Sequence, residues 1–303
     1  KNKSKLDHPP QFLIDFFTQE YSLDYCIHAY PKPIIMWGSG IVMGGGLGLF
    51  AASKFAVATE TSRFAMPEIS IGLFPDVGGS YFLNEMPAGV GLFLGITGAS
   101  FNGADAFDVK LASHKLANSS KQTLLTQLVQ IDGVSEQSIE QVLSALQQTD
   151  EPSFASIDTR LHSNFATLSQ LAKAQTLSEA ISSLTNIVEQ KGDDRWWGKA
   201  LKTLKNGSPI TANLVFEQLQ RSKGLTLAQC FSQELNMAVN CSMYGEFEEG
   251  VRALLIDKDF APQWLYQTSD DVPQDLIDAH FSYFAEATHP LHQLEQTYGV
   301  LHD

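Results

Sequence analysis

The sequence predicts an α/β protein whose second half is helical. In the first part of the chain, a short apolar run (34–37, IIMW), a glycine-rich loop (38–46, GSGIVMGGG), a short apolar helix (47–53) and a second apolar run (55–59, FAVAT) follow one another. Strand, loop, helix and strand in this order are typical of an α/β layer architecture. Beyond about residue 117 helix-favouring segments dominate. We therefore expect a core over 1–117 and a helical region over 118–303, including the EGVRALLIDKD segment.

The first element is predicted to be a helix over 9–29. Apolar residues recur there at helical spacing, and PKP at 31–33 ends the pattern. The residues that form this pattern are Phe12, Phe16, Tyr21, Tyr25 and Ala29.

Further elements are predicted from the same signals. Residues 64–66 favour an extended segment, 75–79 a turn, and 80–94 a helix with a break near 86–89. In the second half, helices are expected over 121–130, 135–148, 166–190, 211–222, 226–243 and 246–256.

Composition excludes several classes of protein. The 303 residues are 44% hydrophobic and 18% charged, as in an ordinary globular protein, and no apolar run is long enough to span a bilayer. The net charge of -14 disfavours nucleic acid as a partner, because proteins that bind it gather Lys and Arg into a stripe. We therefore expect neither nucleic acid nor a membrane as a partner. A small anionic ligand remains compatible, since a few cations and helix N-termini bind phosphate locally.

Cysteine and histidine usage indicates neither disulfides nor a metal site. Cys26, Cys230 and Cys241 are odd in number and scattered, which is typical of reduced thiols in an intracellular protein. The eight histidines have no ligand spacing and no Cys/His cluster accompanies them. No secretory signal is visible at the start of the sequence. These features predict a cytoplasmic protein, or one of the mitochondrial matrix if the source is eukaryotic.

Two carboxylates stand out in the segment 64–79, FAMPEISIGLFPDVGG. Glu68 and Asp76 each follow a proline directly and lie eight residues apart among apolar residues and glycines. Apolar surroundings shift the pKa of a carboxyl towards the range useful for acid, base or nucleophilic chemistry. The alternative is structural: Glu68 would cap a turn, and the Asp76 side chain would stabilise the bend that follows it.

The glycine loop 38–48 has three interpretations. It is a tight crossover that needs glycine for close packing, a dinucleotide-binding loop, or an oxyanion hole at a helix N-terminus. The dinucleotide interpretation fails on spacing, because Met43 and Leu49 stand where GxGxxG requires glycine. An oxyanion hole predicts acids or bases nearby, and the two carboxylates meet that expectation. The sequence has no GxSxG motif and no marked Ser or Cys nucleophile, so carboxylates would perform the chemistry.

Together these residues resemble the crotonase (enoyl-CoA hydratase/isomerase) superfamily, and within it the 3-hydroxyisobutyryl-CoA hydrolases most closely. The matching segments run from Glu20 to about Trp264 and include the following four: PKPIIMWGSGIVMGGGLGL, FAMPEISIGLFPDVGGSYFL, LGITG and EGVRALLIDKDFAPQW. The resemblance implies a spiral of ββα turns followed by helices, and an acyl-CoA substrate whose thioester oxygen is held by backbone N–H groups. No separate cofactor is implied, because CoA is part of the substrate. A homo-oligomer is expected, since the superfamily often forms trimers or hexamers.

The resemblance also assigns roles to residues. Gly45, with Gly44 beside it, matches the loop that donates to the thioester oxygen, and Glu68 matches the principal catalytic carboxylate. Asp76 matches a second acid that binds the substrate hydroxyl or assists proton transfer, and Glu20 matches a further substrate contact.

For the CoA phosphates, the sequence suggests Arg252 and Lys258, which lie in the C-terminal motif. The alternative is that both belong to surface ion pairs. The second glutamate of the hydratases aligns with Phe93, which disfavours hydration of a double bond. The family's upstream strands and an FCAGGD-like loop, which supply the other oxyanion donor, have no match before Glu20.

Three functions follow from this comparison. The first is hydrolysis of a short branched 3-hydroxyacyl-CoA, most closely 3-hydroxyisobutyryl-CoA, in valine degradation. The second is that of an enoyl-CoA hydratase or isomerase. The third is binding of acyl-CoA without catalysis. It is suggested by the missing match to the upstream strands and loop of the family.

Overall fold

The computed structural model describes residues 8–244 and 246–301 of the chain. Its first helix, α1 (Gln11–His28), confirms the helix expected over 9–29. Two short strands follow, β1 (Ile35–Gly38) and β2 (Ile41–Met43), and then α2 (Gly45–Ala52). The strand β2 corrects the prediction of a continuous loop over 38–46, because its three residues pair with a later strand.

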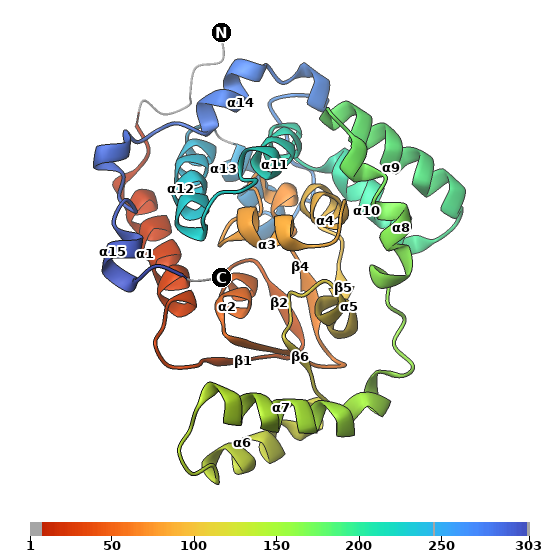
Figure 1. Cartoon of the computed structure of the whole chain (residues 1–303). Coiled ribbons are helices and arrows are strands. Elements are labelled where there is room, and N and C mark those ends of the chain that lie inside the picture. Colours follow the sequence, from red (N-terminus) through yellow and green to blue (C-terminus); the bar gives the residue numbers. More distant parts are fainter. Residues whose placement is uncertain (1–7, 245, 302–303) are drawn as a thin grey trace.

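The strands form two small sheets, seen near the centre of Figure 1. β3 (Phe55–Ala58) lies in the first sheet between β1 and β6 (His114–Lys115), and all three strands are parallel. β4 (Arg63–Ala65) lies in the second sheet, parallel to β2 and antiparallel to β5 (Phe101–Asn102). The first four strands thus alternate between the two sheets, as expected for a ββα spiral, whereas β5 stays in the second sheet beside β4 and β6 returns to the first.

Helices surround the sheets. The expected break over 80–94 is confirmed, because α3 (Gly79–Glu85) ends before α4 (Val90–Thr97) begins. Above them in Figure 1 lie α11 (Pro209–Arg221) and α12 (Leu227–Tyr244). The remaining helices of the core and of the C-terminal region are α5 (Gly103–Asp108), α13 (Glu246–Val251), the π-helix η6 (Arg252–Ile256), α14 (Gln274–His280) and α15 (Leu294–Tyr298).

A hairpin of α6 (Lys121–Val129) and α7 (Glu136–Asp150) packs below the first sheet (Figure 1). A separate apolar cluster holds it there, and Val57 and Leu143 are fully buried in that cluster. The main cluster draws buried residues from Phe17 to Leu294, so both halves of the chain contribute to one core.

For the second half, one expectation was wrong and one helix was not expected. The stretch 166–190 is not one helix, because it is divided into α8 (Phe165–Leu168), η5 (Leu171–Lys173) and α9 (Leu177–Lys191). The Thr176 side chain accepts a hydrogen bond from the Glu179 N–H and thereby begins a new helix. The helix α10 (Arg195–Asn206) was not predicted at all.

The remaining short 3₁₀ helices are η1 (Glu68–Ile71), η2 (Asn118–Ser120), η3 (Glu151–Phe154), η4 (His162–Asn164), η7 (Ser269–Asp271) and η8 (Glu286–Thr288). Across the described ranges, no helix combines the length and the apolar character needed to cross a membrane.

Candidate active site

The N-terminus of α2 lies between two glutamates. Gly44 precedes the helix with φ of +54°, a conformation that glycine adopts easily. A Cβ built on Gly44 would lie 3.7 Å from Oε1 of Glu68, and one built on Gly45 would lie 2.8 Å from Oε1 of Glu20. The N–H of Gly45 is the first of the helix and has no acceptor within it. Glycine at these positions therefore leaves room beside an N–H that can donate a hydrogen bond to an oxygen that becomes negative.

Glu68 begins the short helix η1 directly after Pro67. Its side chain is buried, and among the described residues its Oε2 atom has no hydrogen-bond partner. Burial, and then the charge of Asp76, raise the pKa of Glu68 well above its usual value. A buried carboxyl oxygen without a partner is unfavourable for stability, and such groups are typical of functional sites.

Asp76 lies in a tight turn and faces α1. Tyr21 Oη donates a 2.8 Å hydrogen bond to Asp76 Oδ2, and both side chains are buried. The pKa of Asp76 is raised to about 7, mainly by burial. The hydrogen bond from Tyr21 acts against this rise, and the charge of Glu20 adds to it. The turn is closed by the backbone of Asp76 itself, whose carbonyl accepts from the N–H of Gly79 at 2.8 Å. The turn is thus closed by a backbone hydrogen bond and does not depend on the Asp76 side chain, as the structural alternative had required.

The turn after Asp76 is strained. Val77 has φ of +52° and Gly78 has φ of +88°. Positive φ is costly for a β-branched residue and persists only where the surroundings enforce it. Gly48 of α2 permits this arrangement, because a Cβ at that position would lie 2.5 Å from Cβ of Val77.

The sequence interpretation missed the residue that holds this turn. Glu234 of α12 is fully buried and accepts hydrogen bonds from the N–H groups of Gly78 (2.9 Å) and Ser80 (2.8 Å). From α11, Gln218 Nε2 donates to the carbonyl of Pro75 at 2.7 Å and to Ser80 Oγ at 2.8 Å. Two helices of the second half therefore fix the turn that carries Asp76.

Asp24 was also missed. It lies one turn after Glu20 on α1, is 1% exposed, and its Oδ2 has no partner among the described residues. Burial raises the pKa of Asp24 to about 8, helped by the charges of Glu20, Asp76 and Glu234. Burial likewise raises the pKa of Glu234 to about 8. We call Glu20, Asp24, Glu68, Asp76 and Glu234 the acid cluster. Within the described ranges, no group of three or more His, Cys, Asp or Glu side chains is arranged to hold a metal ion.

The acid cluster predicts that stability decreases as pH rises above 7. The pKa values of Asp24 and Glu234, about 8, exceed those of the unfolded chain, so the folded state keeps protons that the unfolded state has lost. The stability from these protons is complete near pH 4 and is lost as pH rises through 8. Above pH 7 unfolded histidines are already neutral and do not oppose the trend. We expect the free energy of unfolding to fall by up to about 1.4 kcal/mol per pH unit for each group.

Urea unfolding at pH 7.0, 7.5 and 8.0 measures this effect. The Asp24→Asn protein is the matched comparison, and it should lose less stability over the same interval. A wild-type stability that stays level or rises between pH 7 and 8 would contradict the assignment.

Arg252, one of the two cations suggested for the CoA phosphates, forms its salt bridges with acids outside the acid cluster. Arg252 is held by three carboxylates, with its nitrogens 2.7–2.8 Å from oxygens of Glu249, Asp257 and Asp259. Lys258 is exposed and lies between the last two of these acids in the sequence. For Arg252 the alternative of a surface ion pair therefore holds, because three carboxylates already neutralise its guanidinium.

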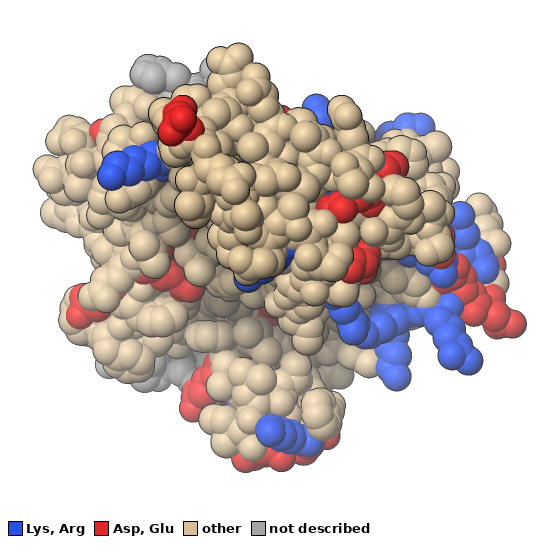
Figure 2. All heavy atoms as spheres, turned by 90° about the horizontal axis from the view of Figure 1, so that it is seen from below, with Lys and Arg blue, Asp and Glu red and all other residues tan. Residues whose placement is uncertain are grey.

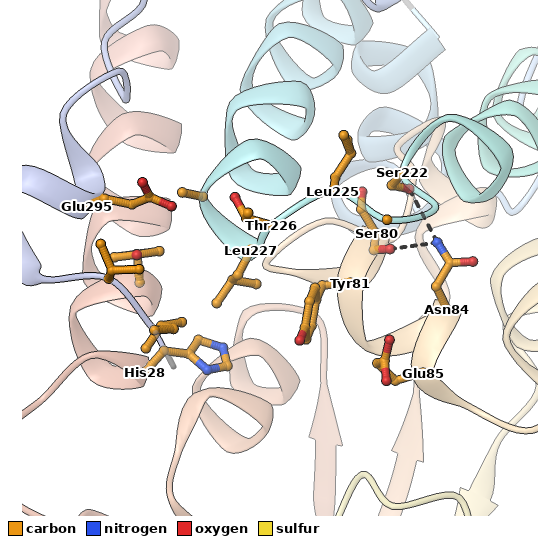
Figure 3. Close-up of a pocket in the computed structure, with 15 residues that line it drawn as sticks. His28, Ser80, Tyr81, Asn84, Glu85, Ser222, Leu225, Thr226, Leu227 and Glu295 are labelled. Atoms are coloured by element: carbon orange, nitrogen blue, oxygen red, sulfur yellow. Dashed lines mark hydrogen bonds between the residues drawn. The ribbon is translucent and has the colours of Figure 1, made fainter. Parts of the chain in front are cut away.

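A hollow of about 480 Å³ lies beside the Asp76 turn, where Ser80 forms part of its wall (Figure 3). Asn84 Nδ2 donates to the carbonyl of Ser80 at 3.0 Å and closes that side. His28 and Glu85 border the hollow. Burial lowers the pKa of His28 to about 4, so its imidazole is neutral at pH 7. A neutral histidine and an acidic rim do not suit a phosphate.

Known proteins resemble this chain in both sequence and structure. A family model described as enoyl-CoA hydratase/isomerase matches residues 2–281. The chain is 34% identical over 267 residues to "3-hydroxyisobutyryl-CoA hydrolase, mitochondrial" of Dictyostelium discoideum. It is 36% identical over 270 residues to the protein of that name from Xenopus tropicalis. Each match covers 88% of this chain and 68% of the relative.

Solved structures agree on the fold. A carnitinyl-CoA dehydratase from Mycobacterium thermoresistibile has a TM-score of 0.76 at 28% identity, covering 89% of this chain and 74% of that one. An enoyl-CoA hydratase from Rhodobacter sphaeroides has a TM-score of 0.74 at 29% identity, covering 90% and 74%. With its alternating ββα core and its glycine-led helix beside buried carboxyls, the chain belongs to the enoyl-CoA hydratase/isomerase family and has the crotonase fold.

Proposed function

We propose that this protein hydrolyses a short 3-hydroxyacyl-CoA thioester, and that 3-hydroxyisobutyryl-CoA, an intermediate of valine degradation, is its substrate. The observation that carries the proposal is the placement of Glu68 and Asp76, two buried carboxyls that interact beside the N-terminus of α2. The relatives named 3-hydroxyisobutyryl-CoA hydrolase, at 34–36% identity, support the choice of substrate.

Each residue has a chemical task in this proposal. The Glu68 carboxylate attacks the thioester carbonyl, and the N–H of Gly45 donates to the oxygen that becomes negative. The C–S bond breaks, and the departing CoA sulfur takes a proton. Water then cleaves the resulting acyl anhydride, which releases the acid and restores the Glu68 carboxylate. In the alternative route Glu68 removes a proton from the attacking water.

Asp76 and Glu20 act on the acyl group. Asp76 accepts a hydrogen bond from the 3-hydroxyl and passes protons, and a pKa near 7 suits both tasks. Tyr21 keeps its carboxylate in one orientation through the 2.8 Å hydrogen bond. Glu20, whose carboxylate lies over Gly45, contacts the substrate from α1.

A hydratase is the less favoured function. The position that aligns with the second hydratase glutamate is Phe93, which is fully buried and packs against Trp196 and Trp197 with ring centroids 5.1 and 5.3 Å away. An apolar ring cannot supply the second acid that hydration by two glutamates needs. The buried Asp76 lies in a different place, where hydrolysis can use it.

The test compares three thioesters with the full-length protein. We expect CoA release from 3-hydroxyisobutyryl-CoA, slower release from isobutyryl-CoA, which lacks the hydroxyl, and no loss of enone absorbance from crotonyl-CoA. Hydration of crotonyl-CoA without CoA release would make the protein a hydratase. Binding of all three thioesters without turnover would make it an acyl-CoA-binding homologue.

A further inference from the structure

Glu234 of α12 lies in an unusual place for a charged residue. Figure 2 shows Lys, Arg, Asp and Glu side chains on the lower face of the protein, where water can solvate them. The side chain of Glu234 is instead fully buried. Burial of a carboxyl is costly unless hydrogen bonds compensate for it, so the partners of Glu234 indicate what it does.

The partners of Glu234 are two backbone N–H groups at the start of α3. The N-cap residue of this helix is Gly78, which has no side chain to cap it. One carboxyl oxygen of Glu234 accepts from the N–H of Gly78 at 2.9 Å, and the other accepts from the N–H of Ser80 at 2.8 Å. The N–H of Gly79, between them, donates to the carbonyl of Asp76. Glu234 therefore takes the place of the missing helix cap, from a helix that is distant in the sequence.

The start of α3 decides where the Asp76 side chain lies. Only Val77 separates Asp76 from Gly78, and its φ of +52° is one that a β-branched residue adopts only when its surroundings enforce it. Without an acceptor for the two N–H groups, we expect this backbone to relax to a less strained conformation. The carboxylate of Asp76, one residue before Val77, would then move with it.

A second residue of α12 holds the partner of Asp76. Phe231 lies one turn before Glu234 on the same face of the helix, and it is also fully buried. Its ring centroid is 5.8 Å from that of Tyr21, whose hydroxyl donates to Asp76 at 2.8 Å. A Cβ built on Gly78 would lie 3.5 Å from Cζ of Phe231. One face of α12 thus fixes both the donor and the acceptor of the Tyr21–Asp76 hydrogen bond.

Glu234 is not placed to act on a substrate directly. Its side chain is fully buried, and each of its two oxygens already accepts a hydrogen bond from an N–H group. Asp76 is the acid that the proposed function assigns to the 3-hydroxyl of the substrate. Any effect of Glu234 on catalysis must therefore pass through the turn that carries Asp76.

We propose that Glu234 is a positioning residue that sets the preference of this site for acyl groups with a 3-hydroxyl. It holds the carboxylate of Asp76 where that hydroxyl can donate to it, and it does not touch the substrate. The inference rests on the proposed function for the role of Asp76.

The test compares kcat/KM for 3-hydroxyisobutyryl-CoA and for isobutyryl-CoA in the full-length Glu234→Gln protein. The amide can accept from only one of the two N–H groups, because its nitrogen is a donor. A displacement of about 1 Å in a catalytic group costs on the order of 10²-fold in rate, so we expect kcat/KM for the hydroxylated thioester to fall by roughly 10- to 100-fold. Isobutyryl-CoA has no hydroxyl for Asp76 to bind, and its kcat/KM should fall much less.

A double-mutant cycle with Asp76→Asn identifies the route of the effect. If Glu234 acts through Asp76, adding Glu234→Gln to Asp76→Asn should lower kcat/KM for 3-hydroxyisobutyryl-CoA by no more than about twofold. Losses that multiply in the double variant, or equal losses on both thioesters in Glu234→Gln, would overturn the inference.

Two further variants separate positioning from a general loss of stability. Ile139→Ala shortens a buried side chain in the separate apolar cluster below the first sheet. It should lower stability without changing the ratio of the two kcat/KM values. Phe231→Leu weakens the support of Tyr21 and Gly78 and should lower that ratio, even if the Glu234→Gln protein does not fold. A ratio that Phe231→Leu leaves unchanged would count against the inference.

Hydrolysis of neither thioester by the wild type would overturn the proposed function, and binding then decides the role of Glu234. Calorimetry gives the dissociation constants of the two thioesters. Tighter binding of the hydroxylated thioester by the wild type, together with equal binding of both by Glu234→Gln, would support the inference. Equal binding of both thioesters by the wild type would overturn it.

Discussion

Replacing Glu68 by Gln is expected to reduce thioester hydrolysis by roughly 10²- to 10⁴-fold, the range typical of losing a catalytic acid or base. The amide keeps the shape of the side chain but can neither attack the carbonyl nor accept a proton from water. Initial rates of CoA release from saturating 3-hydroxyisobutyryl-CoA measure the effect.

Stability measurements keep this result separate from misfolding. Because burial raises the pKa of Glu68 and its charged form is disfavoured, Gln should not destabilise the fold at pH 8. Glu85→Gln, an exposed change on α3, is the control and should retain full activity. A Glu68→Gln protein that is folded and as active as wild type would remove Glu68 from the mechanism.

Replacing Asp76 by Asn is expected to have the second largest effect, about a 10²-fold loss of kcat/KM on 3-hydroxyisobutyryl-CoA. The amide can still accept the Tyr21 hydrogen bond, so the turn should persist, but it cannot pass a proton. Isobutyryl-CoA has no hydroxyl to bind, and its hydrolysis should fall much less.

The same substitution should also change the pH profile. The charge of Asp76 contributes to the raised pKa of Glu68, so its removal lowers that pKa. The acidic limb of kcat/KM for isobutyryl-CoA should then move to lower pH, because Glu68 stays ionised further into acid. Equal losses on both substrates with an unshifted profile would mean that Asp76 has only a structural role.

The parts of the candidate site that the sequence could predict are those with a local signal. Glu68 and Asp76 are marked by the proline before each, and Gly45 by the glycine-rich loop before a helix. The structure brings these three residues and Glu20 together around the start of α2. Their roles in catalysis remain predictions.

Glu234 could not be predicted, because its contacts are distant in sequence. It lies 156 residues from Gly78, and no motif within its own helix marks it. The strained φ of Val77 was equally hidden, since no local pattern announces a valine with positive φ. Such a turn exists only because α11, α12 and Gly48 enforce it.

The errors in the fold have two causes. The three residues of β2 become a strand by pairing with β4, and Ile41 at its start is 74% exposed, so no buried pattern marks it. The helix α10 is capped by Asp194, whose side chain accepts from the N–H of Trp196 at 2.9 Å. An aspartate at this position is a local signal for a helix start, and the sequence interpretation missed it.

The most direct test of the account is the rate of CoA thiol release from 3-hydroxyisobutyryl-CoA by the full-length wild-type protein, measured in parallel with the Glu68→Gln protein. The account predicts multiple turnovers by the wild type and a rate at least about 10²-fold lower for the variant. No release above the uncatalysed background by the wild type, or equal rates for the two proteins, would contradict it.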